Sequence, residues 1–126
     1  MNVLETIEVL KIFLNRQINS LALTNPILSF SKPLITRVIN NNIHKANGFL
    51  SMLADENGNI DVQSLVPEMI QSVMTTRPFV YHTEFLGDLE IGGGFIILNM
   101  PLTNSQIVLG KNDLDALKEL FTENKV

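Results

Sequence analysis

Apolar side chains recur at helical spacing along the N-terminal part of the chain, which predicts helices there. The first helix covers residues 3–21 and ends before Asn25-Pro26, because proline disfavours helical backbone in the residue that precedes it. Residues 27–32, ILSFSK, then predict a short apolar connector. We therefore expect one long helix followed by an irregular segment.

Two further helices are expected at the same spacing. Pro33 is a favoured first helical residue, since its missing N–H costs nothing there, and the apolar face after it continues to about residue 54. The next helix covers residues 62–75, where the Asp61 carboxylate can act as N-cap by accepting orphan N–H groups. Pro67 lies inside this segment and predicts a kink or a later start.

Beyond Arg77-Pro78 the apolar pattern changes to alternation, which predicts strands. Residues 79–86 form the first predicted strand, and Gly87-Asp88 forms a two-residue hairpin turn after it. Residues 89–100 and 106–109 form the second and third strands. We expect an antiparallel meander, because short connections join consecutive strands.

A last helix follows, with Asn112 as its N-cap and Asp115 three residues on as an imperfect capping box. The predicted fold is therefore α+β, with three N-terminal helices, a three-stranded antiparallel β-meander and one C-terminal helix. Residues 1–126 are expected to form a single domain, with a helical part to about residue 76 and the sheet and last helix over 77–126.

The connector LADENGNIDVQSL has the Asp, Asn and Gly content of a calcium-binding EF-hand loop. Such a loop needs glycine at its sixth position and carboxylates at its first and twelfth. Placing Gly58 sixth puts Leu53 and Ser64 at the two carboxylate positions. A start at Asp55 fails as well, because Ile60 then takes the place of the glycine. We predict no metal site here and interpret the stretch as a connector between helices.

Three consecutive glycines lie inside the second predicted strand, where glycine weakens pairing and needs a reason. With Gly87-Asp88 as the turn, His82 would pair with Gly93, and Tyr81 would pair with and cover Gly94. A bulge or the close approach of another backbone is the structural interpretation, and a small-ligand pocket is the functional alternative. A phosphate-binding loop is not expected, because GGGF lacks the Lys-Ser/Thr of a P-loop and does not open a helix. The ligand-binding residues of that alternative are Arg77, Tyr81, His82, Glu84, Gly92, Gly93 and Gly94.

His82 and Glu84 are two residues apart on a predicted strand, so they share one side. A histidine–carboxylate pair can carry out general acid–base chemistry. The sequence places no recognisable nucleophile beside them, and His44, the other histidine, falls on a predicted helix. An enzyme using this pair is therefore our last-ranked hypothesis, and we predict no catalytic residue, no metal ligand and no cofactor.

Several large apolar side chains lie off the core-facing stripe of the first helix or in the connector after it. Internal packing is the structural alternative, because four helices can cover a small sheet. Because large exposed apolar patches are rare on monomers, we favour self-association, most commonly as a homodimer and alternatively as a ring. Only 17% of the residues are charged, which favours the same conclusion. The predicted self-association residues are Val9, Ile12, Phe13, Ile27, Leu28 and Phe30.

Composition narrows the possible partners and compartments. The net charge is −4 and the nine cations are spread along the chain, which argues against a nucleic-acid partner. The chain has no cysteine, no basic leader and no apolar run long enough to cross a bilayer, so we expect a cytoplasmic protein without a membrane partner. The abundance of Asn and Ile is typical of an AT-rich genome, such as that of a low-GC bacterium or its virus.

These observations rank three functions. The first is a small, non-catalytic, self-associating interaction protein of assembly, adaptor or inhibitor type, whose partner is itself or another protein. The second is a small-ligand-binding module with a pocket at the Gly92–Gly94 strand. The third is the enzyme using His82 and Glu84. No motif is specific enough to name a family.

Overall fold

The computed structural model describes residues 1–82, 87–99 and 106–123. In chain order the elements are α1 (Val3–Ala22), α2 (Pro26–Asn42), the 3-10 helix η1 (Ile43–Ala46), α3 (Asn47–Leu53), α4 (Val62–Thr75), β1 (Phe79–His82), β2 (Asp88–Gly92), β3 (Phe95–Asn99), β4 (Gln106–Leu109) and α5 (Lys111–Glu123). The fold is α+β, as predicted, with an antiparallel sheet in the order β1-β2-β3-β4.

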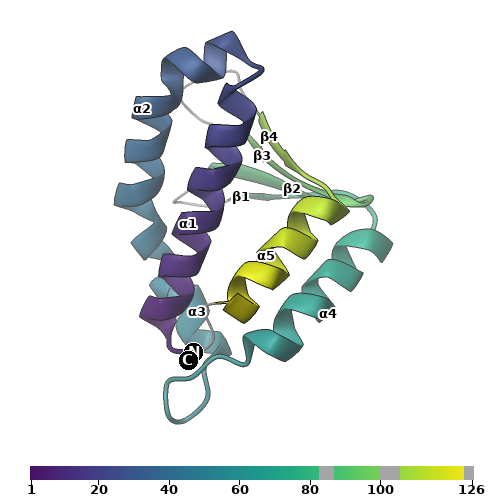
Figure 1. The fold of residues 1–126 in the computed structure, drawn as a ribbon. Helices are drawn as coiled ribbons and strands as arrows, with labels where there is room; N and C mark the ends of the chain where they lie inside the picture. Colours follow the sequence, from purple (N-terminus) through teal and green to yellow (C-terminus); the bar gives the residue numbers. More distant parts are fainter. Residues whose placement is uncertain (83–86, 100–105, 124–126) are drawn as a thin grey trace.

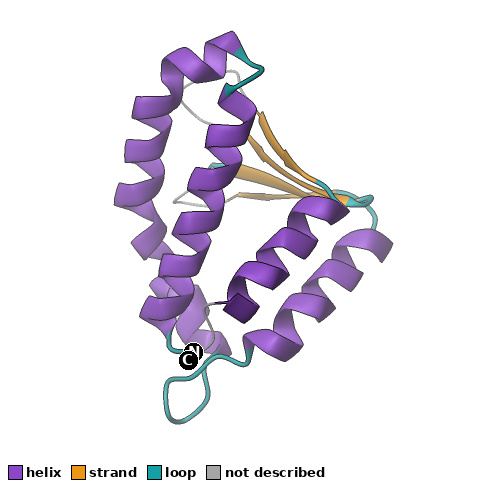
Figure 2. Ribbon diagram, viewed as in Figure 1, coloured by secondary structure: helices purple, strands orange, loops and turns teal. Residues whose placement is uncertain are grey.

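The helices form two pairs in front of the sheet (Figure 1). α1 packs against α2, α4 packs against α5, and α1, α4 and α5 contact the strands. Figure 2 shows how fully the helical and strand regions separate. One cluster of buried residues draws on both helix pairs and on the sheet. Within the described residues, no helix has the length and apolar character that crossing a membrane requires.

The predicted first helix is confirmed as α1. Asn2 and Glu5 form a capping box, in which Asn2 Oδ1 accepts from the Glu5 N–H at 2.8 Å and Glu5 Oε1 accepts from the Asn2 N–H at 3.0 Å. The segment before the helix is also held, because the Ile60 N–H donates to the Met1 carbonyl at 2.6 Å. The connector after α3 is thus tied to the N-terminus.

The predicted connector over residues 27–32 is wrong, because α2 begins at Pro26. Asn25 caps it by accepting from the Leu28 N–H at 3.1 Å, and Pro26 takes the first helical position. Pro33 lies inside the helix on its exposed side. The segment is helical instead of irregular because helical backbone places Leu28 on the buried side of α2, where it packs into the core.

The predicted second helix is divided into α2, η1 and α3. Asn42 marks the division, because its Nδ2 donates to the Val38 carbonyl at 2.7 Å and so offers the backbone an alternative partner. Ile43, Ala46 and Leu50 are buried after the break. The number of helices before the sheet is therefore larger than the three predicted.

The ends of the last two helices test the capping predictions. α4 begins after Asp61, whose Oδ1 accepts from the Ser64 N–H at 3.3 Å, and it continues through Pro67 without ending. α5 begins before the predicted cap at Asn112. The Leu114 N–H donates to the Gly110 carbonyl, and Asp113 Oδ2 accepts from the Gly110 N–H at 3.0 Å, so Gly110 is the cap.

Among the described residues the sheet has four strands instead of three, because Gly93 and Gly94 form a turn that divides the predicted second strand. Their φ angles are +63° and +92°, the backbone that a two-residue hairpin of this kind requires and that glycine adopts without strain. The predicted turn at Gly87-Asp88 is wrong. His82 pairs with Asp88 and Tyr81 pairs with Leu89, so the predicted register is wrong as well.

The β2–β3 hairpin docks on the C-terminal end of α4. The Gly93 N–H donates to the Thr76 carbonyl at 2.9 Å and the Gly94 N–H donates to the Val73 carbonyl at 3.0 Å. These bonds satisfy carbonyls that the end of a helix leaves without partners. A Cβ on Gly92 would lie 2.8 Å from the backbone of Thr76 and Arg77. The glycines therefore allow a close backbone approach.

The two faces of the sheet differ in what covers them. Leu98 and Ile107 pair across β3 and β4 and are buried toward the helices, while Val108 points to the other face and is exposed. β1 lies at the edge of the sheet. Phe79 and Tyr81 pair with residues of the helix-facing side, yet both remain about half-exposed.

Candidate functional site

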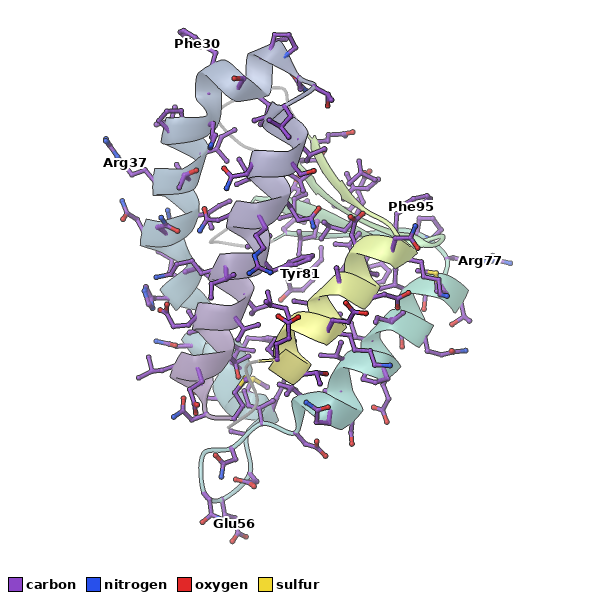
Figure 3. All side chains as sticks on the ribbon, in the orientation of Figure 1. Phe30, Arg37, Glu56, Arg77, Tyr81 and Phe95 are labelled. Atoms are coloured by element: carbon purple, nitrogen blue, oxygen red, sulfur yellow. The ribbon has the colours of Figure 1, made fainter. Side chains whose placement is uncertain are left out.

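The residues of the predicted ligand pocket do not converge. Tyr81 and His82 are consecutive on β1 and therefore point to opposite faces of the sheet. Gly92 is packed against the backbone that precedes β1, and Gly93 forms part of the turn. Arg77 is exposed and points away from the molecule (Figure 3). Gly94 is the second turn residue, and Glu84 lies outside the described residues.

His82 has a carboxylate partner in Asp88. The two atoms His82 Nδ1 and Asp88 Oδ1 are 2.7 Å apart across the β1–β2 pair, and both side chains are largely exposed. The row continues across the sheet, since Asn99 Nδ2 donates to the Asp88 carbonyl and Gln106 Nε2 donates to Asn99 Oδ1. These four side chains form a polar row on the solvent-exposed face of the sheet.

The six predicted self-association residues divide into two groups. Val9, Phe13 and Leu28 are buried in the core, so as surface residues they are excluded. These side chains pack inside the molecule because α1 contacts α2 on one side and other helices on another. The three that remain on the surface are Ile12, Ile27 and Phe30.

Ile27, Phe30 and Leu34 form what we call the α2 ridge. They follow one another at i, i+3 and i+7, which places them along one side of α2. Phe30 is 91% exposed and Ile27 is 68% exposed, so these side chains gain little from the fold itself. Arg37 lies one heptad beyond Phe30 on the same side, and both point outward in Figure 3.

At the other end of the helical region lies an apolar groove of about 320 Å³ between α1, α3, α4 and α5. Phe49 and Met69 stand at its exposed rim, whereas Leu50 and Phe121 are buried in its walls. Thr6 is the one polar residue among the described lining residues, and its hydroxyl donates to the Asn2 carbonyl at 2.8 Å. Its lining residues are Thr6, Leu10, Phe49, Leu50, Leu53, Ile60, Val62, Leu65, Val66, Met69, Leu117 and Phe121.

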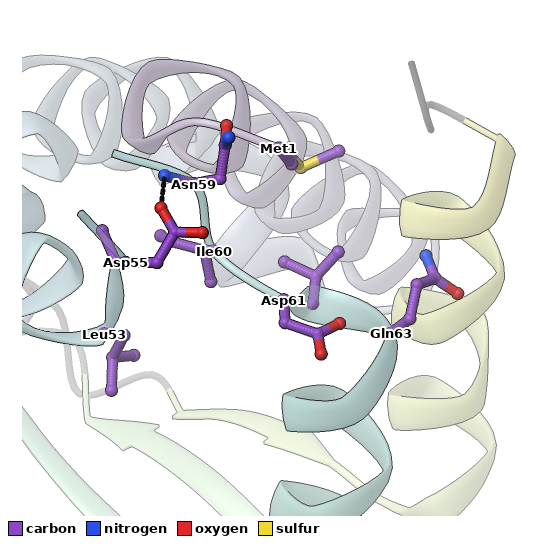
Figure 4. Close-up of a pocket in the computed structure, with 9 residues that line it drawn as sticks. Met1, Leu53, Asp55, Asn59, Ile60, Asp61 and Gln63 are labelled. Atoms are coloured by element: carbon purple, nitrogen blue, oxygen red, sulfur yellow. Dashed lines mark hydrogen bonds between the residues drawn. The ribbon is translucent and has the colours of Figure 1, made fainter. Parts of the chain in front are cut away.

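A more polar hollow of about 420 Å³ adjoins the groove (Figure 4). Leu53, Ile60 and Val62 line both the hollow and the groove. Asp55 and Asp61 line the hollow but not the groove. Asp55 Oδ1 accepts from the N–H groups of Asn57 and Asn59, which holds the connector in its turn. Within the described residues, no group of three or more metal-ligating side chains is present. The two carboxylates thus shape the connector and give it negative charge.

Replacing Asp61 with Ala is expected to lower the free energy of unfolding by about 1 kcal/mol, because α4 loses its N-cap. Asp61→Asn keeps a side-chain oxygen in the same place and is expected to retain most of the stability. Urea denaturation of the two variants and the wild-type chain measures both effects. An Asn variant as unstable as the Ala variant would show that the charge matters and the cap does not.

The distribution of charge is a signal that our reading of the cations missed. No Asp or Glu occurs between Glu8 and Asp55. Residues 1–54 contain five Lys or Arg and two carboxylates, whereas residues 55–126 contain four Lys or Arg and eleven carboxylates. The α2 ridge lies in the basic part, and Asp55 and Asp61 beside the groove belong to the acidic part. The charge difference between the two parts therefore comes mainly from the absence of Asp and Glu in the first part, and not from a cluster of Lys and Arg.

Comparison of the chain with protein-family models, curated proteins and solved structures gave no match. The interpretation of its surfaces therefore depends on the geometry above.

Proposed function

We propose that this protein is a small, non-catalytic interaction protein that self-associates, with the α2 ridge as its contact surface. The observation that carries the proposal is the exposure of Ile27, Phe30 and Leu34 in one row on a helix. Aromatic residues at the centre of an interface contribute much of its binding energy. Phe30 is therefore the residue on which we expect association to depend most.

The chemistry around the ridge supports this proposal over catalysis. Three large apolar side chains in a row form a patch that water solvates poorly, and monomers rarely keep such patches free. In contrast, the histidine–carboxylate pair on the sheet is largely exposed to solvent, which weakens its electrostatic effect. An assembly, adaptor or inhibitor role uses the first kind of surface.

Phe30→Glu is expected to weaken self-association about tenfold or more, since burying a phenylalanine contributes about 1.5–3 kcal/mol. Sedimentation velocity over a concentration series from low micromolar to near millimolar measures the effect. Gln71→Glu is the control for the added charge, because Gln71 is exposed on α4 and lies outside both the α2 ridge and the groove. We expect that control to associate as the wild type does.

Two outcomes would contradict the proposal. A wild-type chain that stays monomeric over the whole series would remove self-association as its function. Equal association of wild type and Phe30→Glu would remove the α2 ridge as the contact. Unfolding curves of both variants distinguish a lost interface from a lost fold.

A further inference from the structure

The α2 ridge needs a counter-surface, and the same chain carries one. The groove between α1, α3, α4 and α5 is apolar and open, and its rim residue Phe49 is 59% exposed. A helix that presents apolar anchors at i, i+3 and i+7 is the kind of element that such grooves bind. The ridge and the groove are thus both apolar, and the ridge has the anchor spacing that such a groove binds.

Their positions exclude contact within one molecule. Phe30 lies near one end of the helical region, and Glu56, on the connector beside the groove, lies at the opposite end (Figure 3). The two surfaces must therefore meet between different copies. Because the surfaces differ, each copy that docks its ridge still offers a groove.

Charge favours the same pairing. Arg37 follows the ridge on the same side of α2, and no carboxylate lies within α2. Asp55 and Asp61 line the hollow that adjoins the groove. A basic flank on one surface and an acidic flank on the other attract at encounter, whereas a ridge against a second ridge offers no carboxylate to Arg37. The charge difference between the two parts of the chain thus acts across the contact.

We propose that the α2 ridge of one copy docks in the α1–α3–α4–α5 groove of the next, so that copies assemble head to tail. This inference rests on the proposed self-association and adds its geometry. A contact between two different surfaces generates a ring if the rotation closes and an open chain if it does not. A half-turn between copies closes the ring at two, with each ridge in the other copy's groove, and any other rotation gives a larger assembly.

Two complementary variants test this geometry. Phe30→Glu destroys the ridge and keeps the groove, while Phe49→Lys alters the groove rim and keeps the ridge. Each alone is expected to associate at least about tenfold more weakly than wild type. An equimolar mixture is expected to form a one-to-one heterodimer that grows no further, because only one intact ridge and one intact groove remain. Sedimentation velocity and native mass spectrometry measure the products.

A second groove variant, Met69→Lys, guards against an effect peculiar to Phe49, since Met69 is also exposed at the rim. If both groove variants associate as wild type does while Phe30→Glu does not, the ridge is the contact but the groove is not its partner. That result overturns the head-to-tail geometry and leaves self-association standing. A monomeric wild type would instead remove the proposed function itself.

A small apolar ligand is the competing occupant of the groove, and the neutral dye Nile red distinguishes it. Dye bound to Phe30→Glu, which keeps its groove, is expected to be displaced when Phe49→Lys is added, because that variant supplies an intact ridge. Displacement by Phe49→Lys but not by the double variant Phe30→Glu/Phe49→Lys supports docking. Dye that stays bound in both mixtures overturns it.

Discussion

Replacing Gly92 with Ala is expected to lower the free energy of unfolding by about 2–5 kcal/mol, from backbone strain and overpacking together. The added Cβ would lie 2.8 Å from the carbonyl carbon and oxygen of Arg77 and from the Thr76 oxygen. These are backbone atoms at the C-terminal end of α4 and cannot turn away as a side chain does. The φ of Gly92 is +120°, which an alanine adopts only with strain.

Two other glycines separate these causes. Gly58 has a φ of +77° and open space around its Cβ position, so Gly58→Ala reports the backbone strain alone, on the order of 1–2 kcal/mol. Gly48 lies in α3, its φ is not positive, and an added Cβ would meet no atom within 4 Å. Gly48→Ala is therefore expected to stabilise the chain by about 0.5–1 kcal/mol.

Urea denaturation of the three alanine variants gives the comparison. From most to least stable, the expected order is Gly48→Ala, wild type, Gly58→Ala and then Gly92→Ala. If Gly92→Ala costs no more than Gly58→Ala, the β2–β3 hairpin does not approach the end of α4 as closely as described. The hydrogen bonds from Gly93 and Gly94 to α4 would then be in question as well.

The triple glycine also shows where sequence reasoning ended. Glycines inside a strand pattern demanded a structural cause, and a close backbone approach was one of the causes considered. The actual cause is Thr76, whose carbonyl oxygen accepts from the Gly93 N–H and fills the space beside Gly92. No local pattern relates these positions, so the turn was placed at Gly87-Asp88 instead.

The helices were more predictable, since burial on one side leaves a periodic pattern. α1 and α4 agree with their predicted ranges to within one residue. The start of α2 was missed because Asn25-Pro26 and Pro33 both favour a helix start, and only packing decides between them. Leu28 is buried and Phe30 is exposed on the same helix, a difference that depends on where α1 lies.

The candidate interface was predictable in part. Ile27 and Phe30 were among the predicted self-association residues, and both are exposed. The groove was beyond reach, because its lining comes from four helices whose residues are far apart in sequence. The charge difference between the two parts of the chain was available throughout, but it gains meaning only when the ridge and the groove are placed at opposite ends.

Ile107→Ala is expected to lower the free energy of unfolding by about 2–5 kcal/mol, because it leaves a cavity in the core. Ile107 is 0% exposed on β4, the strand that both α1 and α5 contact. Val108 follows on the same strand, points to the outer face and is 42% exposed. Val108→Ala is the matched control, with an expected cost below about 1 kcal/mol, in line with other exposed substitutions.

The same experiment tests whether residues 1–126 behave as a single domain. Far-UV circular dichroism follows mainly the helices, while the fluorescence of Tyr81 follows the sheet, because the chain has one tyrosine and no tryptophan. If one core joins both parts, the loss of Ile107 shifts the two unfolding transitions together, since coincident probes mark a cooperative unit. A fluorescence transition that separates from the circular dichroism signal would show instead that the sheet unfolds apart from the helices. A Val108→Ala cost that matches the cost of Ile107→Ala would show that the outer face of the sheet is also covered, and a second copy would then be the first candidate for what covers it.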